Sequence, residues 1–252
     1  MPETALPGYE RLAGAEGAGV LHAPGLGERG REVLGYLETG MRELPEVLGE
    51  PGPDHLAALL VAERDWREAP RENSRPYPPG LPYSTRASGE PTLVLPERLS
   101  PEIRPRTGAT LPLVVWHEEA HAFLLERELV KTPAWLRELI PQAASAAVAR
   151  RAGLPLGEHL AEIDPDPDFT VRGFRGPAGA EEQMAFQNLL LSLGAAALAG
   201  FREGFLGRLV GTLREEIDLV GEHRAEELLA ASLGVGGRGW LSGRPEYAGA
   251  GA

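Results

Sequence analysis

Two histidines and a glutamate stand at a fixed spacing in the stretch "LVVWHEEAHAFLLERE": they are His117, Glu118 and His121. On a helix, residues four apart lie only about 40° from each other around the axis, so both imidazoles point to one side and can share a metal ion. Glu118 lies about 60° beyond His121, where its carboxylate reaches a metal-bound water more easily than the metal. Zinc lowers the pKa of such a water towards about 7, and the glutamate takes its proton as the water attacks a carbonyl carbon.

The same pattern also fits two histidines on a purely structural helix, and the five residues alone leave both interpretations open. A catalytic zinc site needs a third protein ligand and one open position. The chain contains no cysteine, so neither a thiolate ligand nor a disulfide is available. The third ligand must therefore be a histidine or a carboxylate.

Glu138 is the carboxylate that the spacing favours as third ligand. Glu119 faces nearly opposite to the histidines, and Glu126 lies about 140° around the helix from His121, so both face away. If the motif helix ends in a short turn and a second helix follows, His121 lies about 9 Å before the turn and Glu138 about 7.5 Å after it. An antiparallel helix pair would then bring the two side chains level.

The stretch "HEEAHAFLLERELVKTPAWLRELIPQAA" resembles the gluzincin metallopeptidases, the zincins whose third zinc ligand is a Glu on the following helix. It is especially similar to the peptidase-MA-like group, in which that helix carries a segment of the form P-x-W-L-x-E-G-x-A. Here the segment supplies Pro133, Trp135, Leu136 and Glu138. The order of elements upstream is similar as well, so the resemblance covers residues 17–150 and is weaker after that.

This resemblance implies a thermolysin-like fold core and the hydrolysis of peptide bonds. A single Zn²⁺ per chain would be held by His117, His121 and Glu138, with Glu118 as the general base. The implied substrate is a peptide or an unfolded protein. A purely structural helix would need the Trp-Leu-x-Glu segment to be a second coincidence, so we favour the zinc metallopeptidase.

Two departures from the family pattern keep an alternative open. Leu139 stands where a Gly usually follows the ligand Glu, and Pro141 comes two residues later. These peptidases also tend to supply a Tyr or His that stabilises the oxyanion. His159, His223 and Tyr247 are the residues of this chain that could take that oxyanion-stabilising role, although each is better explained as a structural or surface residue. The alternative is a catalytically weak or inactive zincin-fold protein that binds peptides or acts as a scaffold.

The elements that must position these residues follow from hydrophobic periodicity and from Gly and Pro at their ends. A β-α-β-β order precedes the motif and helices follow it, which predicts an α+β fold. The resemblance to the gluzincins implies that this fold is of zincin type. In this fold, a small mixed N-terminal sheet with one helix leads to the motif helix and a C-terminal helical lobe. The predicted strands are 17–23, 54–63, 81–87 and 91–97, and the predicted helices are 27–49, 110–128, 131–153, 156–163, 180–213 and 222–233.

Several residues predict where the helices end. Thr132 is the expected N-cap of the second motif helix, Pro133 its first residue and Gly153 its stop. Pro141 is expected to kink or break that helix, and Pro45 is expected to kink the first helix of the chain or end it early.

The chain is long enough for one large domain with a buried core. We expect a single zincin-like domain over 1–252, with an α/β lobe over 1–108 and a helical lobe over 109–235 that carries the metal site. The Gly-rich segment 236–252 is expected to be a flexible tail.

The segment "LPYSTRA", residues 81–87, is the predicted edge strand of the sheet because it is polar and marked by proline. Zincins commonly hold an extended peptide by adding it to a sheet edge beside the metal. From that resemblance we expect Leu81, Pro82, Tyr83 and Ser84 to bind the substrate.

Composition bounds the class and location of the protein. An apolar content of 42% and a charged content of 25% are typical of a globular chain, and the net charge of −12 disfavours binding to nucleic acid or anionic membranes. The first residues lack the basic and apolar parts of a secretory signal, and the apolar run 188–201 is too short to span a bilayer. We therefore expect a cytoplasmic protein without nucleic-acid or membrane partners; the sequence does not indicate an oligomeric state.

The 23 prolines and the scarcity of Asn and Gln fit a thermophilic source. Lysine occurs once, at Lys131, among the 25 basic residues, and this excess of Arg fits a GC-rich genome equally well.

Overall fold

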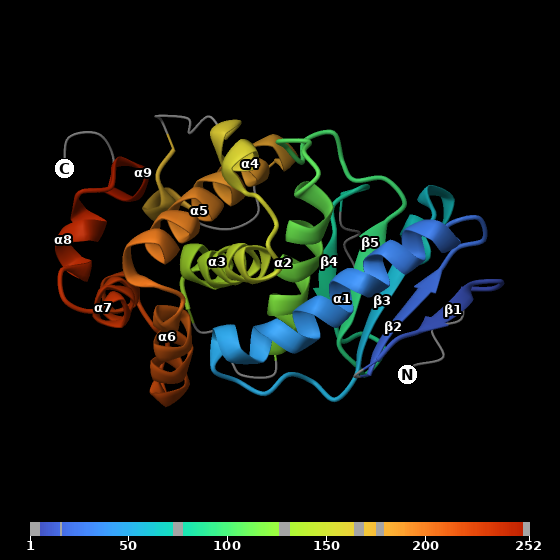
Figure 1. Ribbon diagram of the computed structural model, residues 1–252, viewed down its shortest axis with the longest axis horizontal. Coiled ribbons are helices and arrows are strands. Elements are labelled where there is room, and N and C mark those ends of the chain that lie inside the picture. The colour runs from blue at the N-terminus through green and yellow to red at the C-terminus, as the bar shows by residue number, and fades with distance from the viewer. Residues whose placement is uncertain are drawn as a thin grey trace.

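The computed structural model describes residues 6–15, 17–72, 78–125, 132–163, 169–174 and 179–248. The described chain has an α+β fold, as the sequence predicts. The sheet lies on one side of the molecule, and most helices gather on the other (Figure 1).

The described strands form one mixed, five-stranded sheet in the order β1-β2-β3-β5-β4. β2, β3 and β5 are parallel, while β1 and β4 pair antiparallel at the two edges. The four predicted strands are confirmed in position, and β1 is an addition, since its sequence ERLA is largely exposed and lacks an apolar signal. The strands are β1 (Glu10–Ala13), β2 (Ala18–His22), β3 (Leu56–Val61), β4 (Tyr83–Thr85) and β5 (Thr92–Pro96).

The sheet is covered on both faces, which explains the unbroken apolar run of β3. Leu56 and Leu60 belong to the main core, which the sheet shares with the helices. Leu59 and Val61 belong to a smaller cluster around Trp66. Successive side chains of a strand point to opposite faces, so a strand buried on both sides carries no polar alternation.

One helix joins β2 to β3, and the remaining helices follow the sheet in the chain. α2 lies between the sheet and the later helices, so it joins the two lobes (Figure 1). The helices are α1 (Gly27–Leu48), α2 (Thr110–Leu125), α3 (Ala134–Arg151), α4 (Gly157–Ala161), α5 (Ala180–Phe201), α6 (Gly204–Glu215), α7 (Glu222–Leu233), α8 (Gly237–Ser242) and α9 (Pro245–Ala248), with 3₁₀ turns η1 (Glu63–Glu68) and η3 (Val171–Gly173). The predicted end of the motif helix near residue 128, and Glu126 with it, lie outside the described residues.

Neither internal proline interrupts its helix. α1 continues through Pro45 to Leu48, and α3 is continuous through Pro141, so a break at either residue is a wrong prediction. A proline inside a helix costs about 3 kcal/mol because it loses a hydrogen bond and crowds the preceding turn. Leu44 precedes Pro45, and Val47 and Leu48 follow it. All three side chains are buried, and their burial offsets that cost.

The start of α3 differs from the prediction, whereas its end agrees with it. Pro133, not Thr132, is the N-cap, and the helix begins at Ala134. The predicted stop is confirmed: Gly153 adopts a left-handed conformation with φ 71°, and the N–H of Leu154 donates back to the carbonyl of Ala149 over 2.8 Å. This arrangement is a Schellman-type helix end, in which glycine tolerates the positive φ.

The predicted helix 180–213 is two helices, because Arg202 takes a positive φ of 63° between α5 and α6. α5 has 22 residues and is apolar enough to cross a membrane by length and composition alone, unlike the shorter apolar run that the sequence shows. In the structure α5 packs against α3, and Leu189, Leu190 and Leu193 are buried in the main core. Its apolar character is that of a core helix, and a cytoplasmic location stays a prediction.

The C-terminal segment is not a frayed tail over its described part. α8 and α9 fold back onto the helical lobe, and Tyr247 is only 1% exposed. Its ring lies edge-on to Trp135 at 5.7 Å between centroids. A glycine-rich composition predicts disorder only when apolar anchors are absent, and here the buried tyrosine is such an anchor.

Candidate metal centre

The structure brings together the three residues that the sequence predicts as metal ligands. His117 and His121 lie on α2, and Glu138 lies on α3. Their ligand atoms converge: the two Nε2 atoms are 3.1 Å apart, and Glu138 Oε2 lies 3.3 Å from His121 Nε2 and 3.5 Å from His117 Nε2. No other such cluster of potential ligands occurs among the described residues.

These distances fit a shared metal ion. Ligand atoms about 2.0–2.2 Å from a tetrahedral ion lie about 3.3–3.6 Å from one another. Two of the three separations, 3.3 and 3.5 Å, fall within that range, and the third, 3.1 Å, is slightly shorter. Two imidazole nitrogens and one carboxylate oxygen are also a common donor set for a divalent transition metal. The His-His-Glu group can therefore hold a metal ion.

The helix geometry that achieves this differs from the expected one. In Figure 1, α3 runs across α2 instead of antiparallel beside it. His121 and Glu138 nevertheless come within 3.3 Å of each other. Leu139 and Pro141 do not displace Glu138: Leu139 is buried in the core, and Pro141 is accommodated within α3.

The charges around the three ligands favour an ionised carboxylate. Burial acts to raise the pKa of Glu138, but His121 and His117 outweigh it, and the pKa lies well below its ordinary value. Burial acts to lower the pKa of His121, whereas Glu138 raises it above its ordinary value. A bound metal ion would require His121 to be neutral, because a ligating imidazole has no proton on the nitrogen that faces the metal.

Glu118 lies beside the three ligands and has its own partner. Its side chain is almost fully buried, and the backbone N–H of Ser84 donates to its carboxylate. Burial raises the pKa of Glu118, and His117, His121 and the Ser84 N–H offset only part of that rise. A carboxylate with a raised pKa next to a metal is suited to proton transfer near neutral pH.

The Ser84 contact shows how the sheet edge lies relative to the metal centre. β4 is the last strand of the described sheet, and Ser84 stands opposite Leu93 of β5. Leu81 and Tyr83 turn their side chains inward: Tyr83 packs edge-on to Trp66 at 5.8 Å and donates to the carbonyl of Pro70. The edge strand is thus confirmed beside α2, and substrate binding by Leu81, Pro82, Tyr83 and Ser84 stays a prediction.

Two glutamines that the sequence does not single out complete the surroundings of Glu138. Gln187 of α5 donates from Nε2 to Glu138 Oε2 over 2.8 Å. Gln142 of α3 donates from its own Nε2 to Gln187 Oε1 over 2.6 Å. Gln187 is 49 residues from Glu138 in the chain, and no spacing rule connects them.

The three suggested substitutes for an oxyanion-stabilising residue have other contacts. His159 is buried, and its Nδ1 lies 2.7 Å from the hydroxyl of Thr107. His223 is exposed and lies 3.3 Å from Glu227, and Tyr247 packs against Trp135. Among the described residues, none of these three contacts the ligand cluster.

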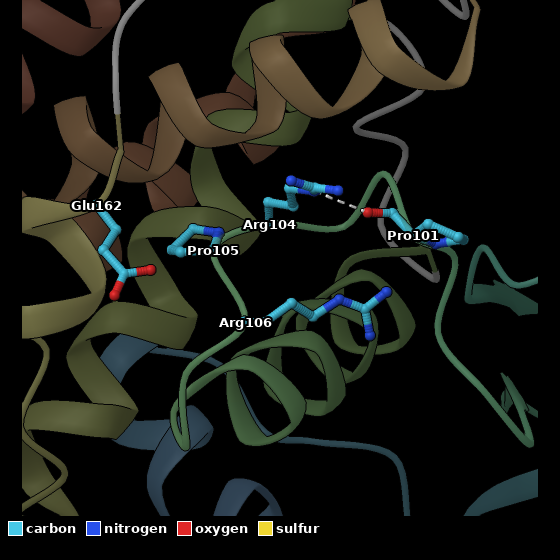
Figure 2. A pocket seen from close by; sticks show the side chains of 5 residues that line it. All are labelled: Pro101, Arg104, Pro105, Arg106 and Glu162. Carbon is cyan, nitrogen blue, oxygen red and sulfur yellow. Dashed lines mark hydrogen bonds between the residues drawn. The ribbon is translucent and has the colours of Figure 1, made fainter.

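A separate pocket of about 560 Å³ lies before α2 and beside the end of α4, lined by Pro101, Arg104, Pro105, Arg106 and Glu162. In Figure 2, the guanidinium of Arg104 is hydrogen-bonded to the carbonyl of Pro101, at 3.1 Å. Arg106 likewise donates to the carbonyl of Leu99, at 3.0 Å. Both arginines hold their own loop, and the lining includes none of the metal-centre residues.

No protein-family model matches the sequence, and no curated protein matches it significantly.

Proposed function

We propose that the protein is a zinc metallopeptidase of gluzincin type with a zincin-like fold. The observation that carries this proposal is the convergence of His117, His121 and Glu138 with separations of 3.1–3.5 Å, next to a buried Glu118. The two histidines come from one helix and the glutamate from the next, as in the family that the sequence resembles.

Each residue of the centre has a distinct role in the proposed reaction. His117, His121 and Glu138 would hold the zinc ion, which would supply a Lewis acid and lower the pKa of the attacking water. Glu118 would accept a proton from the attacking water as the water oxygen bonds to the peptide carbon. The raised pKa of Glu118 then suits it to pass the proton to the leaving amine when the C–N bond breaks.

The substrate in this proposal is an extended peptide or an unfolded segment of a protein. β4 is an edge strand, and its Ser84 N–H points to Glu118, so the free side of the strand runs along the metal centre. A peptide that adds to this edge places its backbone beside the attacking water. The net charge of −12 favours basic over acidic peptides.

The test combines zinc content with turnover. Protein purified without an affinity tag and dialysed against trace zinc should contain about one zinc per chain by elemental analysis, as three protein ligands that converge on one ion imply. The same sample should cleave unfolded casein, and a chelator should stop the cleavage. Zinc content near zero would contradict the metal centre. Full zinc content without turnover would support the alternative, a zincin-fold protein that binds peptides without cleaving them.

A further inference from the structure

The geometry points to Gln187 as the residue that positions Glu138 for metal binding, with Gln142 holding Gln187 in place. The inference rests on the proposed metal centre and adds to it two consecutive hydrogen bonds that connect the centre to α5. One runs from Gln142 Nε2 to Gln187 Oε1 over 2.6 Å, and the other from Gln187 Nε2 to Glu138 Oε2 over 2.8 Å.

The chemistry of the three groups fixes the orientation of this chain. An ionised carboxylate only accepts hydrogen bonds, so the nitrogen of Gln187 must face Glu138 and its oxygen must face away. The oxygen of Gln187 therefore needs a hydrogen-bond donor, and the side-chain nitrogen of Gln142 is that donor. Each group has one orientation that satisfies both bonds, so the amide of Gln187 is not free to flip.

The bond from Gln187 selects one of the two carboxylate oxygens. It ends on Oε2, the oxygen that also faces His117 and His121. A carboxylate oxygen has two lone pairs, so Oε2 can accept from Gln187 and still direct a lone pair to the histidines. Without the amide, the carboxylate of Glu138 can rotate about its side chain. Hydrogen bonds of this kind hold metal ligands in their productive orientation.

The packing of α5 on α3 keeps the donor at this distance. Gly194 of α5 lies so close to α3 that a Cβ atom there would come within 2.9 Å of Ala143. Such close approach of two helix backbones prevents sliding. Gln187 precedes Gly194 by two turns on the same helix, and Gln142 is adjacent to Ala143 in α3. Gln187 and Gln142 therefore come within hydrogen-bond distance because Gly194 and Ala143 let α5 and α3 approach closely.

The role of Gln187 can be tested by comparing three methionine variants of the full chain. Gln187→Met keeps the length of the side chain and removes the donor, and Gln142→Met removes only the outer bond. Gln183→Met is the matched control, one turn earlier on α5, since Gln183 Oε1 has no hydrogen-bond partner among the described residues. For each variant, zinc affinity is measured on the metal-free protein by competition with a chromogenic chelator. The visible spectrum of the Co²⁺ form and the melting temperature of the metal-free form are recorded alongside.

We expect Gln187→Met to weaken zinc binding about 10- to 100-fold, as losses of outer contacts to metal ligands do. Gln142→Met should weaken it less, and Gln183→Met should match the wild type. The Co²⁺ spectrum should change only in the first two variants, while the metal-free melting temperatures stay alike. If Gln187→Met unfolds the protein, Gln142→Met decides, because its change lies one bond further from the metal.

Each other result has a separate meaning. Equal zinc affinity in the wild type, Gln187→Met and Gln142→Met would overturn the positioning role and leave the metal centre standing. A wild type that binds no zinc would overturn both. Zinc binding that depends on Gln187 in a protein without peptidase activity would support the positioning role and contradict only the proposed reaction.

Discussion

Helix α2 carries two adjacent glutamates on different sides, and their surroundings differ completely. Glu118 is buried beside the metal ligands and accepts the N–H of Ser84. Glu119 is fully buried on the side that faces α1, and neither of its carboxylate oxygens has a hydrogen-bond partner among the described residues. Burial raises the pKa of both, and that of Glu119 lies well above its ordinary value.

The difference teaches that two buried carboxylates on one helix can have very different neighbours. Glu119 fits against α1 because Gly40 leaves it room: a Cβ atom at Gly40 would collide with the Glu119 carboxylate. Nearby, the indole of Trp116 donates to the carbonyl of Tyr36, which ties α2 to α1 at 2.9 Å. Glu118 lies beside the candidate metal ligands and a backbone donor, whereas Glu119 lies in a space that Gly40 leaves for it.

Exchanging each carboxylate for an amide should give the largest contrast. Glu118→Gln should lower the rate of peptide hydrolysis about 100- to 10,000-fold, because the general base is lost. Zinc content should stay at the wild-type level in this variant. Glu119→Gln is the matched control and should keep near wild-type activity. Wild-type turnover in Glu118→Gln would contradict the assigned mechanism.

Removing the third ligand should affect only the metal side of the helix. Glu138→Ala should weaken zinc binding by more than the roughly 10- to 100-fold expected for the loss of an outer contact. Added zinc should raise the melting temperature of the wild type but no longer that of Glu138→Ala, because only a bound ion stabilises the folded state. Glu119→Ala should keep the zinc-dependent rise. An undiminished rise in Glu138→Ala would mean that another group completes the site.

Filling the space at Gly40 should affect only the α1 side. Gly40→Ala should lower the free energy of unfolding by about 2 kcal/mol, since the new methyl group displaces the Glu119 carboxylate from a packed site. In a Glu119→Ala background the same change should be neutral or stabilising, because alanine is the better helix former. Chemical denaturation of the wild type, Gly40→Ala, Glu119→Ala and the double variant gives the coupling free energy between Gly40 and Glu119. Additive effects would show that they do not compete for this space.

Replacing Glu119 by an apolar side chain should have the smallest effect and the opposite sign. Glu119→Met should raise the free energy of unfolding at pH 7 by about 1 kcal/mol, since a buried polar group without a partner is destabilising. Zinc content and turnover should be unchanged. A loss of stability in this variant would indicate that Glu119 has a partner in a part of the chain outside the described residues.

The sequence predicts the candidate metal centre better than its surroundings, for a physical reason. The spacing of His117 and His121 is a property of one helix, and Glu138 belongs to a recognisable local segment. Gln187 and the N–H of Ser84 reach the centre only through tertiary packing, which local patterns do not encode. The same reason explains the strand β1, whose polar residues pair by backbone alone, and the C-terminal helices, which depend on burial of Tyr247.

Helix boundaries were predicted less well wherever tertiary contacts outweigh local preference. Pro45 and Pro141 are both tolerated inside helices. In the opposite sense, α5 and α6 separate at Arg202, an arginine with a positive φ, although the nearby glycines Gly200 and Gly204 stand two residues to either side.

The partner of Glu118 at Ser84 is a backbone group, and this has a consequence for how the site tolerates sequence change. Every amino acid except proline carries that N–H, so the side chain at position 84 is free to vary as long as β4 keeps its register with β5. A one-residue slip of β4 would still present a backbone N–H to Glu118, now from a residue next to Ser84. The same slip would turn the buried side chains of Tyr83 and Thr85 to the opposite face of the sheet. The register of β4 is therefore constrained by the packing of these two side chains, and the contact with Glu118 tolerates more change than they do.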